Sequence, residues 1–326
     1  MKKILLALLC ILVLFTSCGM NSDIEFSRTG FHLGTVVSIT VYGGNGESSL
    51  DLAFDEIIRL ESILSKKIEG SDIYNINSNA GLEYVELKPE SLLIIEKSLE
   101  YYKKSNGYFD ITIGPLVDLW NIGTEEAAVP TPDEIENALV LIDINKLDFT
   151  NDMIGLKEPL MSIDTGGIAK GFIADRISEI LVNEGCSGVL INLGGNVLTI
   201  GQKPDGSKWK IGIQDPFMQT GNYMEIVEIN EMSVVTSGPY ERNFVEDGVL
   251  YHHILDPFTG YPIDNNIAGV TIISEKSIDG DGLSTSVFAM GADDGLVLIE
   301  ETDNTECYIV LNDGTIIMSS GFSDYL

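Results

Sequence analysis

The chain has 326 residues and carries 19 Lys and Arg against 50 Asp and Glu, which gives a formal net charge of -31. Nucleic-acid binders need clustered basic side chains to contact phosphates, so this balance excludes that class of protein. The same shortage of cations predicts that any bound phosphate is held by backbone N–H groups, a helix N-terminus or a divalent cation.

The first patterned segment is residues 1–18. Lys2 and Lys3 precede an apolar run over 4–15, which is too short to span a bilayer and is typical of a secretory signal. Small residues leading into Cys18 resemble a bacterial lipobox, in which the cysteine becomes the lipidated N-terminus; an uncleaved anchor is the alternative. We therefore expect a lipoprotein signal peptide over 1–18, a tether over 19–27 and a folded domain over 28–326. The protein is then exported and anchored by lipid to a bacterial membrane, inner or outer, on its periplasmic or extracellular face.

Hydrophobic periodicity predicts the elements that follow. Strands are expected at 35–42, 188–200 with an interruption at 194–196, 209–213 paired with that strand, 223–236, 268–273, 307–311 and 315–318. Helices are expected at 50–64, 91–102, 131–142 and 173–181, with a polar turn at 71–77. No linker rich in Gly, Ser or Pro divides the chain, so we predict one compact α+β (mixed α/β) domain with mixed and antiparallel sheets flanked by helices.

A glycine-rich stretch from Met161 to Arg176 is the strongest single pattern. An apolar segment ending in Asp164 indicates a strand, and a tight turn and a helix follow it. Glycines at 166, 167 and 171 would let the backbone approach a ligand, and the first helical turn would attract phosphate. A plain strand-to-helix turn is the alternative. The stretch matches neither the Walker A loop nor the dinucleotide fingerprint, because Lys170 precedes Gly171.

Two further segments carry candidate chemistry. The chain has three histidines, and adjacent residues of a strand face opposite ways, so His252 and His253 cannot both point into one site. Asp256 follows His253 closely enough to suggest an oriented general base, with a structural histidine as the alternative. A helix beginning near Asp281 would place Asp281 and Thr285 on one face as hard oxygen ligands suited to Mg²⁺; the alternative is that Asp281 is only an N-cap.

Four cysteines occur in the sequence. Cys10 would be lost with the signal peptide and Cys18 would be lipidated. Export would permit Cys186 and Cys307 to form a disulfide, but two distant cysteines do not establish one, so we expect both in the core.

Taken together, five ordered motifs resemble the ApbE family of FAD:protein FMN transferases. They are Leu33-Gly34-Thr35, residues 109–120 (FDITIGPLVDLW), 164–171 (DTGGIAKG), 253–260 (HILDPFTG) and 281–285 (DGLST). The resemblance implies an ApbE-like fold related to the T-fold. It also implies a lipoprotein that attaches flavin to partner proteins.

The resemblance also implies roles for individual residues. Mg²⁺ would be bound by the side chains of Asp281 and Thr285 and the main-chain carbonyl of Gly167, and His253 would be the general base. FAD would contact Leu33, Lys67, Tyr108, Phe109, Asp110, Asp164, Lys170 and the main chain near Leu255. Leu33 replaces the commoner Met, a change that conserves volume. Lys67 stands where relatives often carry an aromatic beside the flavin, which bears on ring stacking and on access of water.

The predicted reaction is Mg²⁺-dependent transfer of FMN from FAD to a Thr or Ser hydroxyl of a target protein through a phosphoester bond, with release of AMP. The alternatives are an FAD pyrophosphatase that yields FMN and AMP, and a non-catalytic FAD-binding lipoprotein. The resemblance suggests exported acceptors such as subunits of ion-translocating NADH:quinone or ferredoxin oxidoreductases.

Overall fold

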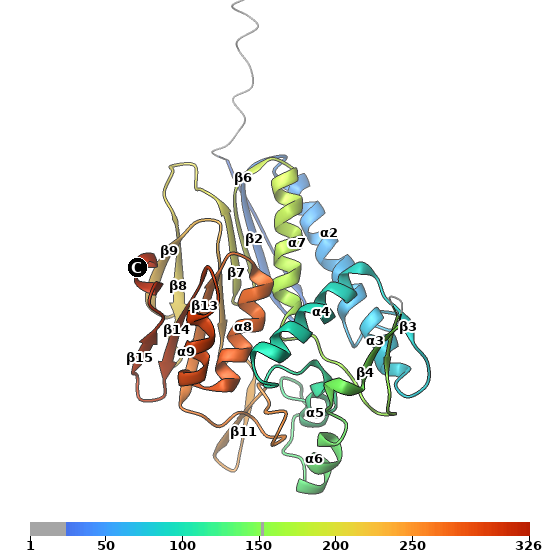
Figure 1. Cartoon of the computed structure of the whole chain (residues 1–326). Helices are drawn as coiled ribbons and strands as arrows, with labels where there is room; N and C mark the ends of the chain where they lie inside the picture. Colours follow the sequence, from blue (N-terminus) through green and yellow to red (C-terminus); the bar gives the residue numbers. More distant parts are fainter. Residues whose placement is uncertain (1–23, 151–152) are drawn as a thin grey trace, which may run out of the picture.

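A central eight-stranded sheet organises the computed structural model, which describes residues 24–150 and 153–326 (Figure 1). The sheet order is β1-β2-β6-β7-β10-β13-β14-β15, and every strand pair in the described part of the chain is antiparallel. The α+β class is thus confirmed, while the expected mixed sheets are replaced by antiparallel ones. The predicted signal peptide, Cys18 and residues 19–23 of the tether lie outside the described residues.

The strands of the main sheet are β1 (Glu25–His32), β2 (Thr35–Gly43), β6 (Cys186–Leu193), β7 (Asn196–Gly201), β10 (Ser233–Ser237), β13 (Ile267–Ser274), β14 (Thr305–Leu311) and β15 (Ile316–Met318). Three small sheets comprise β3 (Val85–Glu86), β5 (Met153–Leu156) and β4 (Leu147–Thr150); β8 (Trp209–Gln214) and β9 (Tyr223–Ile229); and β11 (Asn243–Glu246) and β12 (Val249–His252). Strand β13 is buried along its whole length and is accordingly almost entirely apolar, as expected for a central strand covered on both faces.

The α-helices are α2 (Glu47–Leu64), α3 (Asp72–Ser78), α4 (Pro89–Lys104), α5 (Gly114–Trp120), α6 (Pro132–Leu139), α7 (Ala169–Asn183), α8 (Ser277–Met290) and α9 (Ala292–Glu300). Short 3-10 turns are η1 (Ile111–Ile113), η2 (Ile144–Lys146) and η3 (Phe322–Tyr325). Helix α6 begins with the predicted capping box between Thr131 and Glu134. None of the helices in the described ranges combines the length and the apolar character needed to cross a bilayer.

Three apolar clusters hold these elements together. The largest lies between one face of the sheet and helices α2, α4, α7 and α8, which cover that face in Figure 1. The second lies on the other face of the sheet and includes Trp209 of β8, Val227 of β9 and Phe322 of η3. The third joins α5, α6 and the β11–β12 hairpin at one end of the molecule, around Trp120 and Tyr251. The active-site candidates lie where the first and third clusters meet.

Several expected elements need correction. Strand β1 begins at Glu25 and pairs with β2 from that residue, so 25–27 belong to the sheet and not to a tether. Residues 72–78 form helix α3 in place of a polar turn, because Ser71 caps the helix by accepting from the Tyr74 N–H. Strand β8 pairs with β9 in a separate sheet and not with 188–200.

The segment before the glycine turn also differs from the expected strand. Ile163 is bonded to the Asn77 side chain through both its N–H and its carbonyl, and the Asp164 N–H donates to Ile111 O. The backbone hydrogen bonds of this extended segment are thus made with the Asn77 side chain and the Ile111 carbonyl, so the segment does not pair with a strand. Cys186 and Cys307 are both buried and free, which answers the question of their pairing.

Candidate active site

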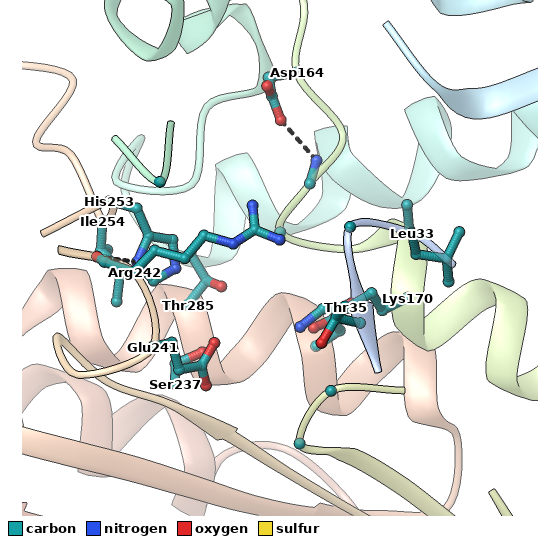
Figure 2. A pocket seen from close by; sticks show the side chains of 18 of the residues that line it. Leu33, Thr35, Asp164, Lys170, Ser237, Glu241, Arg242, His253, Ile254 and Thr285 are labelled. Carbon is teal, nitrogen blue, oxygen red and sulfur yellow. Dashed lines mark hydrogen bonds between the residues drawn. The ribbon is translucent and has the colours of Figure 1, made fainter. Parts of the chain in front are cut away.

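A cavity of about 1270 Å³ opens where the β1–β2 turn, the glycine turn before α7, helix α8 and the segment after β12 converge (Figure 2). Its volume exceeds the usual range of small-molecule pockets, roughly 300–1000 Å³, so it can accept an extended dinucleotide. Every catalytic, FAD-binding and metal-binding residue predicted from the sequence lines it, including the ones that the resemblance alone supplied: Leu33, Lys67, Tyr108, Phe109, Asp110, Asp164, Gly167, Lys170, His253, Leu255, Asp281 and Thr285.

The predicted metal ligands come together from helix α8 and from the glycine turn that precedes helix α7. Asp281 and Thr285 lie one turn apart on α8, and a Cβ added to Gly167 would lie 3.5 Å from Thr285 Oγ1. Asp281 is in the second turn of α8, which begins at Ser277, so it is not the N-cap of that helix. The cap position is served instead by Asp175 of α7, whose carboxylate accepts from the N–H groups of Ser277 and Ile278.

Close packing of α7 against α8 explains one of the glycines. A Cβ at Gly171 would lie 2.2 Å from Ser277 O and 2.6 Å from Ile278 Cα, both main-chain atoms. Only glycine permits this crossing. The expectation that Gly171 admits a ligand is therefore wrong: it admits the neighbouring helix, and its N–H donates to Asp281 Oδ2 at 2.9 Å.

The surroundings of Asp281 fit a hard divalent cation. Its side chain is 4 % exposed, and burial raises its pKa although the charge of Lys170 and the Gly171 N–H oppose that rise. One carboxylate oxygen accepts from the Gly171 N–H, and the Thr285 hydroxyl lies one turn further along the same helix. Oxygen donors of this kind are those that Mg²⁺ prefers. No three His, Cys, Asp or Glu side chains gather into a metal cluster within the described ranges, so a cation here would depend on the hydroxyl and carbonyl donors as well.

Asp164 is held ionised at the start of the glycine turn. Its Oδ1 accepts from Gly166 N at 2.7 Å, and its Oδ2 lies 2.8 Å from Lys66 Nζ, which also reaches Asp118. Burial opposes ionisation, but Lys66 and the Gly166 N–H outweigh it and hold the pKa of Asp164 below its ordinary value. Both oxygens thus have partners, and the carboxylate is fixed in orientation at the cavity edge.

His253 follows β12 and turns into the cavity, whereas the adjacent His252 is buried on the other side against Phe288. The opposite orientations predicted for the two histidines are confirmed. His253 Nδ1 lies 3.3 Å from Arg242 O, and a carbonyl only accepts, so Nδ1 carries the hydrogen and Nε2 keeps its lone pair. Burial, reinforced by the positive charges of Arg242, His252 and Lys170, lowers the pKa of His253 to about 3. The imidazole is therefore neutral at physiological pH and can accept a proton at Nε2.

An aromatic and acidic wall is formed by residues 108–110. Tyr108 is half-buried and packs edge-on against the exposed Phe258. Phe109 is buried against Tyr101, and a Cβ at Gly167 would meet its ring at 3.1 Å, so this ring supports the glycine turn. Asp110 accepts from the N–H and hydroxyl of Thr112 through Oδ1, and burial raises its pKa.

The turn between β1 and β2 is strained where it meets the cavity. Leu33 and Gly34 are its two central residues, with φ of 55° and 69°, as in a type I′ hairpin turn. Leucine seldom adopts this left-handed conformation. The Leu33 N–H donates to Glu61 Oε1 at 3.1 Å, which ties the turn to helix α2.

Comparison with known proteins agrees with this geometry. The model of the ApbE family matches residues 33–309. The chain belongs to the ApbE family. It is 33% identical to an FAD:protein FMN transferase of Treponema pallidum (strain Nichols), over 97% of this chain and 93% of the relative. It is 35% identical to an FAD:protein FMN transferase of Klebsiella pneumoniae (strain 342), over 92% and 94% of the two chains.

Solved ApbE structures share the fold. An ApbE protein from Thermotoga maritima superposes with a TM-score of 0.85 at 32% identity, covering 93% of this chain and 99% of that one. The flavin transferase ApbE from Vibrio cholerae gives 0.83 at 25% identity, with coverage of 93% and 99%. The ApbE fold predicted from the five motifs is confirmed.

Sequence reasoning missed several ionisable residues of this ApbE cavity, among them Lys66, Asp118, Glu241 and Arg242. It also underestimated the cations available to a phosphate, because Lys66, Lys67, Lys170 and Arg242 all line the cavity. The only signal in the sequence was proximity to residues that had been predicted for the site. Lys66 precedes Lys67, and Arg242 immediately precedes the hairpin that ends at His252. Nothing in local sequence showed that these side chains point inward.

Proposed function

We propose that this protein transfers FMN from FAD to a Thr or Ser hydroxyl of an exported acceptor protein, in a Mg²⁺-dependent reaction that releases AMP. The observation that carries the proposal is the meeting of a neutral imidazole, an oxygen-donor set and cationic side chains on one cavity large enough for a dinucleotide. Membership of a family whose curated relatives are named FAD:protein FMN transferases supports it.

The chain's own residues suit each part of a phosphoryl transfer. His253 Nε2 accepts the proton of the acceptor hydroxyl, whose oxygen forms a bond to the FMN phosphorus as the bond to the AMP oxygen breaks. Asp281, Thr285 and the Gly167 carbonyl would bind Mg²⁺, which when bound neutralises charge on the diphosphate. Lys170 adds a positive charge beside Asp281. Positioning and charge neutralisation supply most of the rate enhancement of such reactions, so one base is sufficient.

The FAD contacts inferred for Leu33, Lys67, Tyr108, Phe109, Asp110, Asp164, Lys170 and Leu255 are part of the same proposal, and their common placement on the cavity supports it. Lys67 is exposed and lies at the cavity edge. A flavin ring at this edge would meet an ammonium group and solvent instead of an aromatic face. Water can therefore compete with the acceptor hydroxyl, so the FAD pyrophosphatase reaction remains the second candidate.

The decisive experiment is mass spectrometry of a candidate acceptor incubated with the protein, FAD and Mg²⁺. Covalent FMN on a Thr or Ser, with an equal amount of AMP, is the expected result. AMP released without flavinylation would favour the hydrolase, and FAD binding with no AMP would favour a carrier protein. Candidate acceptors are exported subunits of ion-translocating NADH:quinone or ferredoxin oxidoreductases.

His253→Ala tests the assignment of the base. Because a general base contributes about 10²–10⁴-fold, the variant should lose transfer by that factor while FAD binding persists. Undiminished transfer would remove His253 from the mechanism.

Export and anchoring are proposed on the N-terminal sequence alone. Lys2, Lys3 and the apolar run support a secretory signal, and Cys18 supports lipidation. Labelling cells with radioactive palmitate should mark the wild type and not Cys18→Ser. Equal labelling of both would exclude Cys18 as the modified residue.

A further inference from the structure

Arg242 is unusual among the arginines of this acidic chain. Arg28, Arg59 and Arg176 each form an ion pair with a nearby carboxylate. Arg242 forms none with any residue in the described ranges, although the chain has 50 Asp and Glu. A guanidinium that forms no ion pair with the protein and lies in a cavity is suited to bind an anionic group of a ligand.

The side chain of Arg242 extends across the cavity and passes close to two glycines, which leave room for it. A Cβ added to Gly123 would lie 3.2 Å from Arg242 Cδ, so the aliphatic part of the arginine packs against bare backbone there. A Cβ at Gly34 would lie 3.6 Å from Nη2, which places the tip beside the β1–β2 turn. Figure 2 shows the side chain reaching from the side of His253 towards Leu33 and Lys170. The guanidinium therefore lies in the part of the cavity that an extended ligand must cross.

The main chain of the same residue orients the base. Arg242 O accepts from His253 N at 3.2 Å and from His253 Nδ1 at 3.3 Å. Arg242 and His253 thus flank the open end of one hairpin, next to the pair formed by Asn243 and His252. A ligand group that contacts His253 Nε2 consequently lies in the part of the cavity that the Arg242 guanidinium can reach.

We propose that Arg242 binds the non-bridging oxygens of the substrate diphosphate and neutralises the charge that develops on the phosphoryl group being transferred. This inference rests on the proposed function. As the hydroxyl oxygen bonds to phosphorus, the bond to the AMP oxygen breaks and the proton passes to His253 Nε2. The negative charge on the equatorial oxygens meets a planar donor that can form two parallel hydrogen bonds. Lys170, which acts electrostatically on Asp281, supplies a second cation from helix α7.

The test compares Arg242→Gln, Arg242→Lys and the control Arg28→Gln, an arginine whose ion pairs lie outside the cavity. AMP release from FAD, measured with Mg²⁺ and the acceptor protein present, gives kcat and KM, and flavin fluorescence gives the FAD affinity. A transition-state arginine contributes about 10³–10⁵-fold to kcat, so Arg242→Gln should lose about that factor in kcat and roughly tenfold in FAD affinity. Arg242→Lys should recover part of kcat, and Arg28→Gln should match the wild type.

The outcomes separate this inference from the function on which it rests. If the wild type binds FAD and releases no AMP, the proposed function fails, and the affinity comparison alone decides the role of Arg242. Arg242→Gln with wild-type kcat and affinity would overturn the inference. So would a loss in both arginine-to-glutamine variants, or a loss in Arg242→Gln that Arg242→Lys does not relieve at all while both variants keep the wild-type melting temperature.

Discussion

The two walls of the cavity are built in different ways. Asp281 and Gly167 belong to a wall made of helices α7 and α8 and the turn before α7. The main chains of the two helices touch at Gly171, and hydrogen bonds of Asp175 and of the Gly171 N–H join them. Arg242 and His253 belong to the other wall and flank the two-stranded β11–β12 sheet, in which Val245, Val249 and Leu250 are exposed.

The difference has a physical meaning. A bound cation requires donors held in place before binding, which buried helices provide. An acceptor protein requires access to the attacking position, which a small peripheral hairpin provides. The buried wall should therefore govern stability and metal binding, and the open wall should govern turnover with little effect on folding.

Asp281→Asn should give the largest effect, because it removes the charged side chain proposed to bind Mg²⁺ in the buried wall. A bound metal contributes several kcal/mol of charge stabilisation, so activity should fall about 10³-fold or more and its dependence on Mg²⁺ should disappear. Mg²⁺ should raise the melting temperature of the wild type and leave that of the variant unchanged. The control Asp279→Asn alters a carboxylate of the same helix that faces Tyr101 and Lys97, and it should keep the Mg²⁺ response. A full thermal response in Asp281→Asn would contradict the ligand assignment.

Gly171→Ala tests the rigidity of the same wall. The added Cβ would overlap main-chain atoms of α8, which cannot move aside as a flexible side chain can. We expect a loss of about 3 kcal/mol in the free energy of unfolding, measured in urea, at the upper end of overpacking costs. Gly269→Ala is the matched control, since its nearest new contact would be at 3.8 Å, and it should change stability by less than about 1 kcal/mol. Equal effects of the two substitutions would show that the α7–α8 crossing is not constrained.

His253→Gln tests how much the protonation of His253, on the open wall, changes the free energy of unfolding. The folded pKa of His253 is about 3, below its ordinary 6.5, and Arg242, His252 and Lys170 face it with positive charge. The unfolded chain therefore binds a proton first as pH falls below about 6.5, and wild-type stability declines from there towards pH 3. The variant lacks this loss. Its stability relative to the wild type should improve by about 1 kcal/mol between pH 7.5 and pH 5, after allowance for screening at the open side. Parallel stability curves would contradict the lowered pKa.

Leu33→Asn should give the smallest effect. Asparagine tolerates the left-handed backbone that leucine adopts at this turn, so the variant should gain about 0.5–1 kcal/mol in unfolding free energy. Leu33→Ala shortens the side chain without relieving the backbone, and it should gain nothing. If the strained turn contributes to FAD binding, the more stable variant should also bind FAD less tightly by fluorescence titration. A gain in Leu33→Ala as large as in Leu33→Asn would attribute the effect to the side chain.

The sequence by itself determined the locally encoded features of this protein. The capping box of α6 and the spacing of Asp281 and Thr285 both follow from short-range periodicity and helix-capping chemistry. The order of the five motifs is sufficient to identify the family, and the family match and the relatives confirm it.

Only the tertiary structure decided how these pieces act on one another. It showed that Gly171 serves a helix crossing, that Asp281 lies inside a helix, and that Lys66 and Arg242 point into the cavity. Burial, long-range ion pairs and pKa shifts depend on which distant segments meet, and local propensity carries no information about that meeting. Side-chain direction at the site is consequently a property of the packed core and not of any single stretch of sequence.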